Sequence, residues 1–96
     1  MEPDELQAKI RELTPKILDA MDEIMMSETA SATERLRAVQ MLIRAAVPGG
    51  PAADTARQAL KKAGPVLASV AKAHKSAKIK ARAQRLAQQV NTILKR

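Results

Sequence analysis

The chain lacks phenylalanine, tyrosine, tryptophan and cysteine altogether. Without aromatic rings, the core has to be built from aliphatic side chains and methionine. The bases of a single-stranded nucleic acid could stack only on arginine or on the single histidine, His74. Without cysteine, neither a disulfide nor a thiolate metal site can form, and a lone imidazole does not make a usual zinc site. We therefore expect no metal and no cofactor.

The chain also has no long apolar run. Its longest uncharged stretches, 45–53, 63–71 and 86–94, are nine residues each, whereas a helix that crosses a bilayer needs about 20. Residues 1–12 carry acids where a secretory signal would have a basic start and an apolar segment. These absences predict a cytoplasmic protein that does not contact membranes.

The apolar residues that are present favour helices. They comprise nine Leu, six Ile, five Val and five Met, together with nineteen Ala. Alanine has the highest helix propensity and lets helix backbones approach closely, although each buried alanine removes little apolar area from water. Strand-forming residues are scarce. Because 96 residues make one small domain with a thin core, the composition predicts a single all-α domain over residues 1–96.

The first 26 residues predict one bent helix. Apolar side chains recur at steps of three and four on a single helical face: Leu6, Ile10, Leu13, Ile17, Met21 and Ile24. Pro15 interrupts this stripe without shifting its register, and a proline inside a helix removes a backbone donor and crowds the preceding turn. We expect a kinked helix from about Pro3 to Met26, with the stripe facing the core.

A second helix is predicted to start at Ser31. Ser31 and Glu34 match a capping box, in which the serine hydroxyl accepts from the Glu34 amide and the glutamate returns to the serine amide. The apolar positions that follow have helical spacing: Leu36, Val39, Leu42, Ile43 and Ala46. Two prolines and two glycines at 48–51 end this helix and form a loop.

The second half predicts two short helices and one long helix. Residues 51–63 are expected to form a short helix that Gly64 ends, and Pro65 opens the next one. Ser76 is a suitable cap for the last helix, whose apolar stripe is Ile79, Ala83, Leu86, Val90 and Ile93. A polar row follows one flank of this stripe at the same steps: Lys78, Arg82, Arg85 and Gln89.

The two halves also echo each other. Pro15-Lys-Ile-Leu-Asp-Ala-Met and a later segment from Leu36 are matched by Pro65-Val-Leu-Ala-Ser-Val-Ala and a later segment from Ala81. In this respect residues 15–94 resemble a pair of HEAT-like helical hairpins, a repeat whose first helix often opens at proline. The resemblance implies an all-α fold of four or five helices, with two antiparallel hairpins in a small HEAT-like bundle. The expected limits are about 3–47 for the first hairpin, 48–51 for the loop and 52–95 for the second hairpin.

Residues 66–94 are similar to a second family, the helical bundle at the N-terminus of eukaryotic transcription elongation factors. In that family a Leu-x-x-Leu-x-Lys-His stretch precedes an Ile-x-x-x-Ala-x-x-Leu helix. The matching positions here are Leu67, Val70, Lys72, His74, Ile79, Ala83 and Leu86.

Acidic residues almost disappear after the middle of the chain. Residues 1–50 contain nine acids and six bases, whereas residues 51–96 contain one acid, Asp54, and eleven bases. An exposed helix surface with such a cationic run would hold a strong positive potential. The candidate contacts to DNA or RNA phosphates are therefore Lys72, Lys75, Lys78, Lys80, Arg82, Arg85 and Gln89.

Two other interpretations of the basic row are open at this stage. It could be a solvated helix face that serves solubility, or it could face the acidic first half of this chain or of a neighbour. Readout of base sequence would need donors in a groove. A helix-turn-helix formed by residues 65–75 and 77–94 could place such donors in a groove of the duplex, although the turn between the two helices has no glycine.

A function of another class would use the methionines. Methionine adapts to irregular surfaces, and four lie near the turn between the first two predicted helices: Met21, Met25, Met26 and Met41. They could fill the core, or they could dock an acidic or helical segment of a protein partner. The thin core could also be completed by homo-oligomerisation. No phosphate loop and no nucleophile–base motif is recognisable, so we expect a binding protein and not an enzyme.

Overall fold

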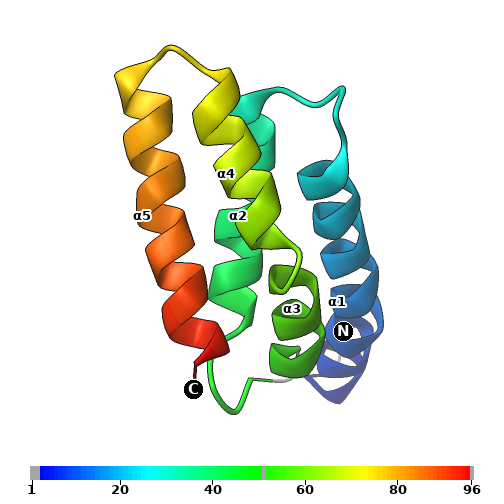
Figure 1. Cartoon of the computed structure of the whole chain (residues 1–96). Helices are drawn as coiled ribbons and strands as arrows, with labels where there is room; N and C mark the ends of the chain where they lie inside the picture. The colour runs from blue at the N-terminus through cyan, green and yellow to red at the C-terminus, as the bar shows by residue number, and fades with distance from the viewer. Residues whose placement is uncertain (1–2, 51, 96) are drawn as a thin grey trace.

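The computed structural model describes residues 3–50 and 52–95, except for the side chains of residues 3, 7, 10 and 11. Over this range the secondary structure is helical and contains no strand, which confirms the all-α prediction (Figure 1). The helices are α1 (Pro3–Met26), α2 (Ala32–Ala45), α3 (Ala53–Leu60), α4 (Ala63–Ala73) and α5 (Ala77–Leu94). None of them is both long and apolar enough to cross a membrane.

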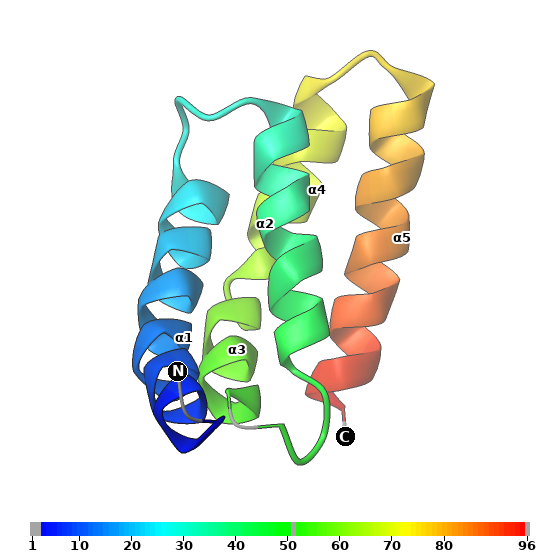
Figure 2. The same cartoon turned by 180° about the vertical axis from the view of Figure 1, so that it is seen from behind.

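Helix α2 occupies the centre of the bundle. It contacts α1, α3, α4 and α5, whereas α1 and α5 make no contact with each other within the described residues. In both views α1 and α5 form opposite edges of the bundle (Figures 1 and 2). The largest fully buried side chains come from several helices: Met25, Leu36, Val39, Leu42, Leu60, Leu67 and Val90.

The helix starts follow the serine caps predicted from the sequence. The Ser31 hydroxyl accepts from the Glu34 amide at 3.1 Å, and the Ser76 hydroxyl accepts from the Ile79 amide at 3.4 Å. Each bond satisfies an amide that has no partner inside its helix. The Glu34 carboxylate does not return a bond to Ser31 among the described residues, so only half of the predicted capping box forms.

The start of α4 differs from the sequence prediction. Gly64 was expected to end the preceding helix, but it lies with Pro65 inside the first turn of α4, which begins at Ala63. A proline is tolerated there because the first-turn amides need no intrahelical acceptor. Ala63 is completely buried, so tertiary packing holds the helix start despite the low helix propensity of glycine.

Replacing Gly64 by alanine is expected to stabilise the fold. A Cβ at Gly64 would meet no atom within 4 Å, and the change lowers the entropy of the unfolded chain by an amount worth about 0.4–1 kcal/mol. Gly49 is the matched control, because its φ of +78° is strained for alanine. In urea unfolding followed by circular dichroism, Gly64→Ala should raise and Gly49→Ala should lower the free energy of unfolding. A less stable Gly64→Ala variant would contradict the helical assignment.

Helix α1 has the predicted limits. It is bent, because its first turns are seen nearly end-on in Figures 1 and 2 whereas the rest of the helix runs along the bundle. Pro15 lies inside it and is the physical cause of such a bend.

The predicted apolar stripe of α1 packs against the core only at Met21 and Ile24, which are half-buried. The buried residues are Leu18 and Met25, whereas Leu6, Leu13 and Ile17 are each 50% exposed. At 3.6 residues per turn, these exposed residues lie about a third of a turn away from Leu18 and Met25. The stripe prediction is therefore wrong for the first half of α1, and the side chain of Ile10 lies outside the described residues.

Candidate nucleic-acid interface

Helix α5 has a buried face and an exposed face. Its predicted stripe is confirmed, because Ala83, Leu86, Val90 and Ile93 are buried and Ile79 is half-buried. The contacts of α5 with α2, α3 and α4 account for this burial. The exposed face is therefore fixed in direction, and it carries basic side chains.

Five of the predicted cations are exposed. Lys72 lies in the last turn of α4, Lys75 in the α4–α5 turn, and Lys78, Lys80 and Arg85 on α5. None of these five side chains has a hydrogen bond or an ion pair within the described residues. Their charges are therefore available to an external anion.

Arg82 and Gln89 are placed differently. Arg82 is half-buried, and its Nη2 donates to Gln40 Oε1 of α2 at 3.2 Å. Gln89 is exposed and lines a shallow cavity of about 210 Å³ together with Ile43, Thr92 and Ile93. The predicted row is thus interrupted, because Arg82 joins two helices and is not free to reach a phosphate without losing that bond.

The lysines gather around one end of the bundle more than along one helix flank. Lys80 follows Lys78 by two residues, which places it about 200° around the α5 axis on the opposite flank. Lys72, Lys75, Lys78 and Lys80 lie at the end formed by the last turn of α4, the turn and the first turns of α5 (Figure 1). We call these four residues the basic end. Helical spacing alone could not reveal it, because its members come from two helices and a turn.

The first turn of α5 strengthens the positive potential of the basic end. It contains no acid, although the partial positive charge of a helix N-terminus favours acids and disfavours lysines by about 0.3–1 kcal/mol each. Lys72 has the opposite relation to its helix, since it lies in the last turn of α4, where a cation is favoured. The charge arrangement at the start of α5 therefore costs folding free energy and favours a bound anion.

Six of the ten acids of the chain lie on α1, at the edge opposite α5. Helix α1 contains six acids and three bases, whereas α5 contains four bases and no acid. These two helices form opposite edges. Asp22 of α1 instead pairs with Lys62, with 2.6 Å between Oδ2 and Nζ. Within the described residues, no acid of this chain pairs with a lysine of the basic end. The structure therefore does not show acids of the same chain neutralising these lysines.

Helices α4 and α5 do not have the arrangement of a helix-turn-helix. They run antiparallel and side by side in both views (Figures 1 and 2), whereas the two helices of that motif cross steeply. His74 forms the C-cap of α4, as expected for a helix-end residue. In this αα-hairpin the outer side of α5 is exposed to solvent, whereas its inner side packs against the other helices.

The four candidate methionines separate into three environments. Met21 and Met41 line the same groove between α1 and α2, which has a volume of about 340 Å³. Met25 is fully buried and belongs to the core, so it cannot contact a partner. Met26 is 46% exposed and does not line that groove. Only two of the four predicted partner contacts are therefore brought together on the surface.

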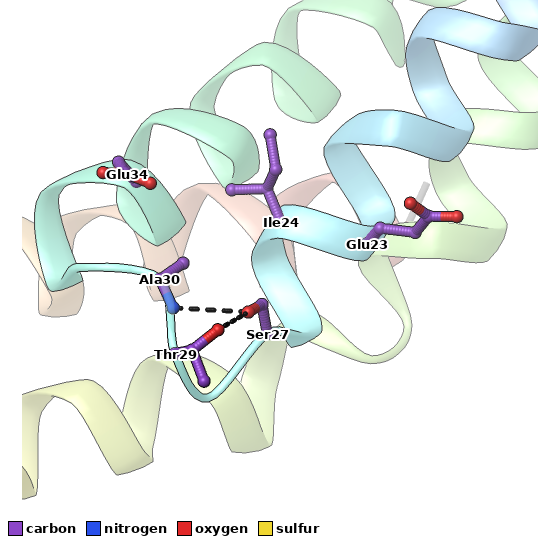
Figure 3. A pocket seen from close by; sticks show the side chains of 6 residues that line it. All are labelled: Glu23, Ile24, Ser27, Thr29, Ala30 and Glu34. Atoms are coloured by element: carbon purple, nitrogen blue, oxygen red, sulfur yellow. Dashed lines mark hydrogen bonds between the residues drawn. The ribbon is translucent and has the colours of Figure 1, made fainter.

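A shallow pocket of about 500 Å³ lies at the turn between α1 and α2 (Figure 3). Its hydroxyl groups are occupied within the turn, because Ser27 Oγ lies 3.0 Å from Thr29 Oγ1 and accepts from the Ala30 amide at 3.3 Å. Glu23 and Glu34 lie on opposite sides of the pocket. Within the described part of the chain, no three acids or histidines are grouped as metal ligands would be.

Comparison of the chain with protein-family models, with curated proteins and with solved structures finds no match.

Proposed function

We propose that this chain is a non-enzymatic polyanion-binding protein whose basic end contacts the phosphate backbone of duplex DNA or RNA. The observation that carries the proposal is the group of four exposed lysines around the first turn of α5, none of them paired within the described residues. Arg85 extends the contact surface, since it lies seven residues, or about 10 Å, beyond Lys78 along α5. The edge that carries the acidic helix faces away from this surface.

The chemistry of the surface favours duplex backbone over single-stranded bases. Lysine and arginine neutralise phosphates and release condensed counterions, which supplies affinity without sequence specificity. Single-strand binders commonly stack bases on aromatic rings, and this chain has none. The inner face of α5 is buried against α2 and α4, so we expect the ridge of α5 to lie along phosphates and not to read base edges.

We further propose that α1 with α2 and α4 with α5 are two HEAT-like hairpins. Support comes from the pairing of neighbouring helices along the chain, since α1 contacts α2 and α4 contacts α5 extensively. The proline inside α1 and the proline in the first turn of α4 also occupy corresponding places in the two sequence segments that echo each other. In this arrangement α3 connects the hairpins, and the basic end belongs to the second hairpin.

Salt dependence tests the proposed function. If three to five cations engage phosphates, the plot of log affinity against log salt concentration should have a slope of about −2.7 to −4.5 on duplex DNA. Affinity should then fall roughly 40- to 500-fold between 50 and 200 mM salt. Fluorescence anisotropy with a labelled 20-base-pair duplex of arbitrary sequence measures both quantities.

Two results would contradict this proposal. One is the absence of binding to duplex DNA and duplex RNA at 50 mM salt and micromolar protein. The other is binding with a slope near zero, because such binding would not depend on phosphate neutralisation. A single-stranded oligonucleotide of the same length serves as the control ligand, and it should bind more weakly than the duplex.

A further inference from the structure

Arg82 carries a positive charge that no acid of the described residues balances. Its side chain is half-buried, and within the described part of the chain its single hydrogen bond runs from Nη2 to Oε1 of Gln40, a neutral amide, over 3.2 Å. A guanidinium has five N–H donors, so most of these donors can still bind an anion. Because water solvates a half-buried charge less well than an exposed one, a carboxylate partner stabilises the guanidinium more than the amide does.

The exposed charges around Arg82 are also positive, and they come from two helices. Helices α2 and α5 lie side by side, and both face the viewer in Figure 2. On α5, Lys78 and Arg85 lie four residues before and three residues after Arg82, so they share its flank. On α2, Arg37 precedes Gln40 by three residues and is exposed. We call the surface formed by these five residues the α2–α5 face.

The acids near these helices lie away from the α2–α5 face. Helix α5 has no acid, and the one acid of α2, Glu34, lies a turn before Arg37 but borders the pocket at the α1–α2 turn (Figure 3). Asp54 of α3 lines a separate cavity at the α2–α3 loop. Arg44 is not counted in this face, because it lines the groove on the α1 side of α2. The charged residues of the α2–α5 face are therefore all basic.

The shallow cavity of about 210 Å³ between α2 and α5 adjoins this face. Its lining residues are Ile43, Gln89, Thr92 and Ile93. Ile43 follows Gln40 by three residues, so the cavity begins about one helical turn beyond the bond between Gln40 and Arg82. A phosphate backbone has no aliphatic group to bury against the isoleucines, whereas a protein segment offers carboxylates and aliphatic side chains together. This combination favours a protein as the occupant.

We propose that Arg82 binds a carboxylate of an acidic helix of another protein. A glutamate of that helix pairs with the guanidinium through two parallel hydrogen bonds, and its neighbouring acids face the exposed cations of the α2–α5 face. A leucine one turn away from this glutamate lies in the shallow cavity beside Ile43. Arg82 and Gln40 lie outside the basic end, so this proposal and the nucleic-acid proposal can fail separately.

A second copy of this chain fits the α2–α5 face poorly. Most of its acids lie on α1. Along one flank of that helix the charged residues follow one another at steps of four and three: Glu5, Lys9, Glu12, Lys16 and Asp19. Each of these three acids has a lysine one helical turn away, and a lysine brought against a basic face is unfavourable. An acidic helix without lysines avoids this repulsion.

The first test uses two alanine-based helical peptides. One carries a leucine with glutamates three and four residues before and after it, and the other carries glutamines in place of the glutamates. With isoleucine methyl labels in the full chain, the glutamate peptide should shift the NMR signals of Ile43 and Ile93 and leave that of Ile17 unchanged. The glutamine peptide should bind at least tenfold more weakly. Equal affinity of the two peptides, or no shift at millimolar peptide, would overturn the proposal.

Variants of Gln40 test the role of Arg82. Gln40→Glu keeps the shape of the side chain and gives Arg82 a carboxylate within the chain, so it should weaken the glutamate peptide at least tenfold. Gln40→Ala removes the bond but leaves Arg82 charged, so it should change the affinity about threefold or less. Circular dichroism verifies the helicity of both variants. Unchanged affinity in Gln40→Glu would mean that Arg82 does not bind the peptide.

A variant of the basic end separates the two proposed sites. Lys75→Glu with Lys80→Glu should weaken duplex DNA and change the affinity of the glutamate peptide less than threefold at 150 mM salt, where the Debye length is about 8 Å. Loss of the peptide in this variant, together with its retention in Gln40→Glu, would assign the peptide to the basic end. That result overturns the binding at Arg82 and leaves the nucleic-acid proposal intact.

Two further arms test the other occupants of the α2–α5 face. Gln40→Glu should change the affinity for duplex DNA less than threefold, and loss of the duplex in this variant would make the face a nucleic-acid surface. Sedimentation of the chain alone should give a monomer at every concentration. A dimer that Gln40→Glu dissociates would place a second copy on the face. Either of these contrary results overturns the binding of an acidic helix.

Discussion

Simultaneous replacement of Lys75, Lys78, Lys80 and Arg85 by glutamate is expected to abolish duplex binding. At 50 mM salt each phosphate contact contributes on the order of tenfold to affinity through counterion release. The loss of four contacts should therefore weaken binding by about four orders of magnitude, which places it below detection in an anisotropy titration. Arg82 is left unchanged because its bond to Gln40 joins α5 to α2. If it were replaced, a loss of DNA affinity could come from altered helix packing as well as from a lost phosphate contact.

The matched control reverses four exposed cations of α1 and α2, which are Lys9, Lys16, Arg37 and Arg44. Each set of four replacements lowers the net charge by eight units, from +7 to −1. If only the overall charge mattered, both variants would lose binding equally, and that outcome would contradict a localised site. The variant of the basic end should also be at least as stable as the parent chain, because a glutamate at position 78 favours the N-terminus of α5 by about 0.3–1 kcal/mol.

Leu42→Ala is expected to cost about 2–5 kcal/mol of unfolding free energy. Leu42 is fully buried in the central helix, and it is one of only 12 buried side chains larger than alanine among the described residues. Small domains are stabilised by few kilocalories in total, on the order of 5–15 kcal/mol. The melting temperature should accordingly fall by roughly 8–40 °C, measured by circular dichroism at 222 nm.

The neighbouring residue supplies the control for this truncation. Met41→Ala removes a side chain of similar size that is 46% exposed, so its cost should stay under about 1 kcal/mol. If Leu42→Ala and Met41→Ala lowered the free energy of unfolding equally, α2 would not bury the face that carries Leu42.

The limits and faces of most helices could be predicted because their causes are local. Ser31 and Ser76 cap helices through bonds to amides three residues later, and such spacing is visible in the sequence. The stripe of α5 is buried as predicted because it is the one strongly apolar face of that helix. At Gly64 a local rule failed, since burial of Ala63 outweighed the tendency of glycine to end a helix.

The candidate sites could be predicted only in part, because they depend on contacts between distant residues. Arg82 and Gln40 are 42 residues apart, so nothing near Arg82 indicates that it is held. The exposure of Leu6, Leu13 and Ile17 on α1 has the same origin. Periodicity identifies an apolar face of a helix, but the fold decides which part of that face contacts other helices. Met25 and Met26 are adjacent and chemically identical, yet one is buried and the other is exposed.

The placement of α1 and α5 on opposite edges also affects how the molecule approaches a polyanion. With a negative edge and a positive edge, the bundle has an electric dipole that turns α5 toward the phosphates during a diffusional encounter. At least one helix separates the two edges, so they lie about 16–20 Å apart, or about two Debye lengths at 0.1 M salt. Repulsion from α1 is therefore screened once α5 is in contact. Salt should accordingly reduce the association rate through lost orientation as well as the affinity through lost counterion release.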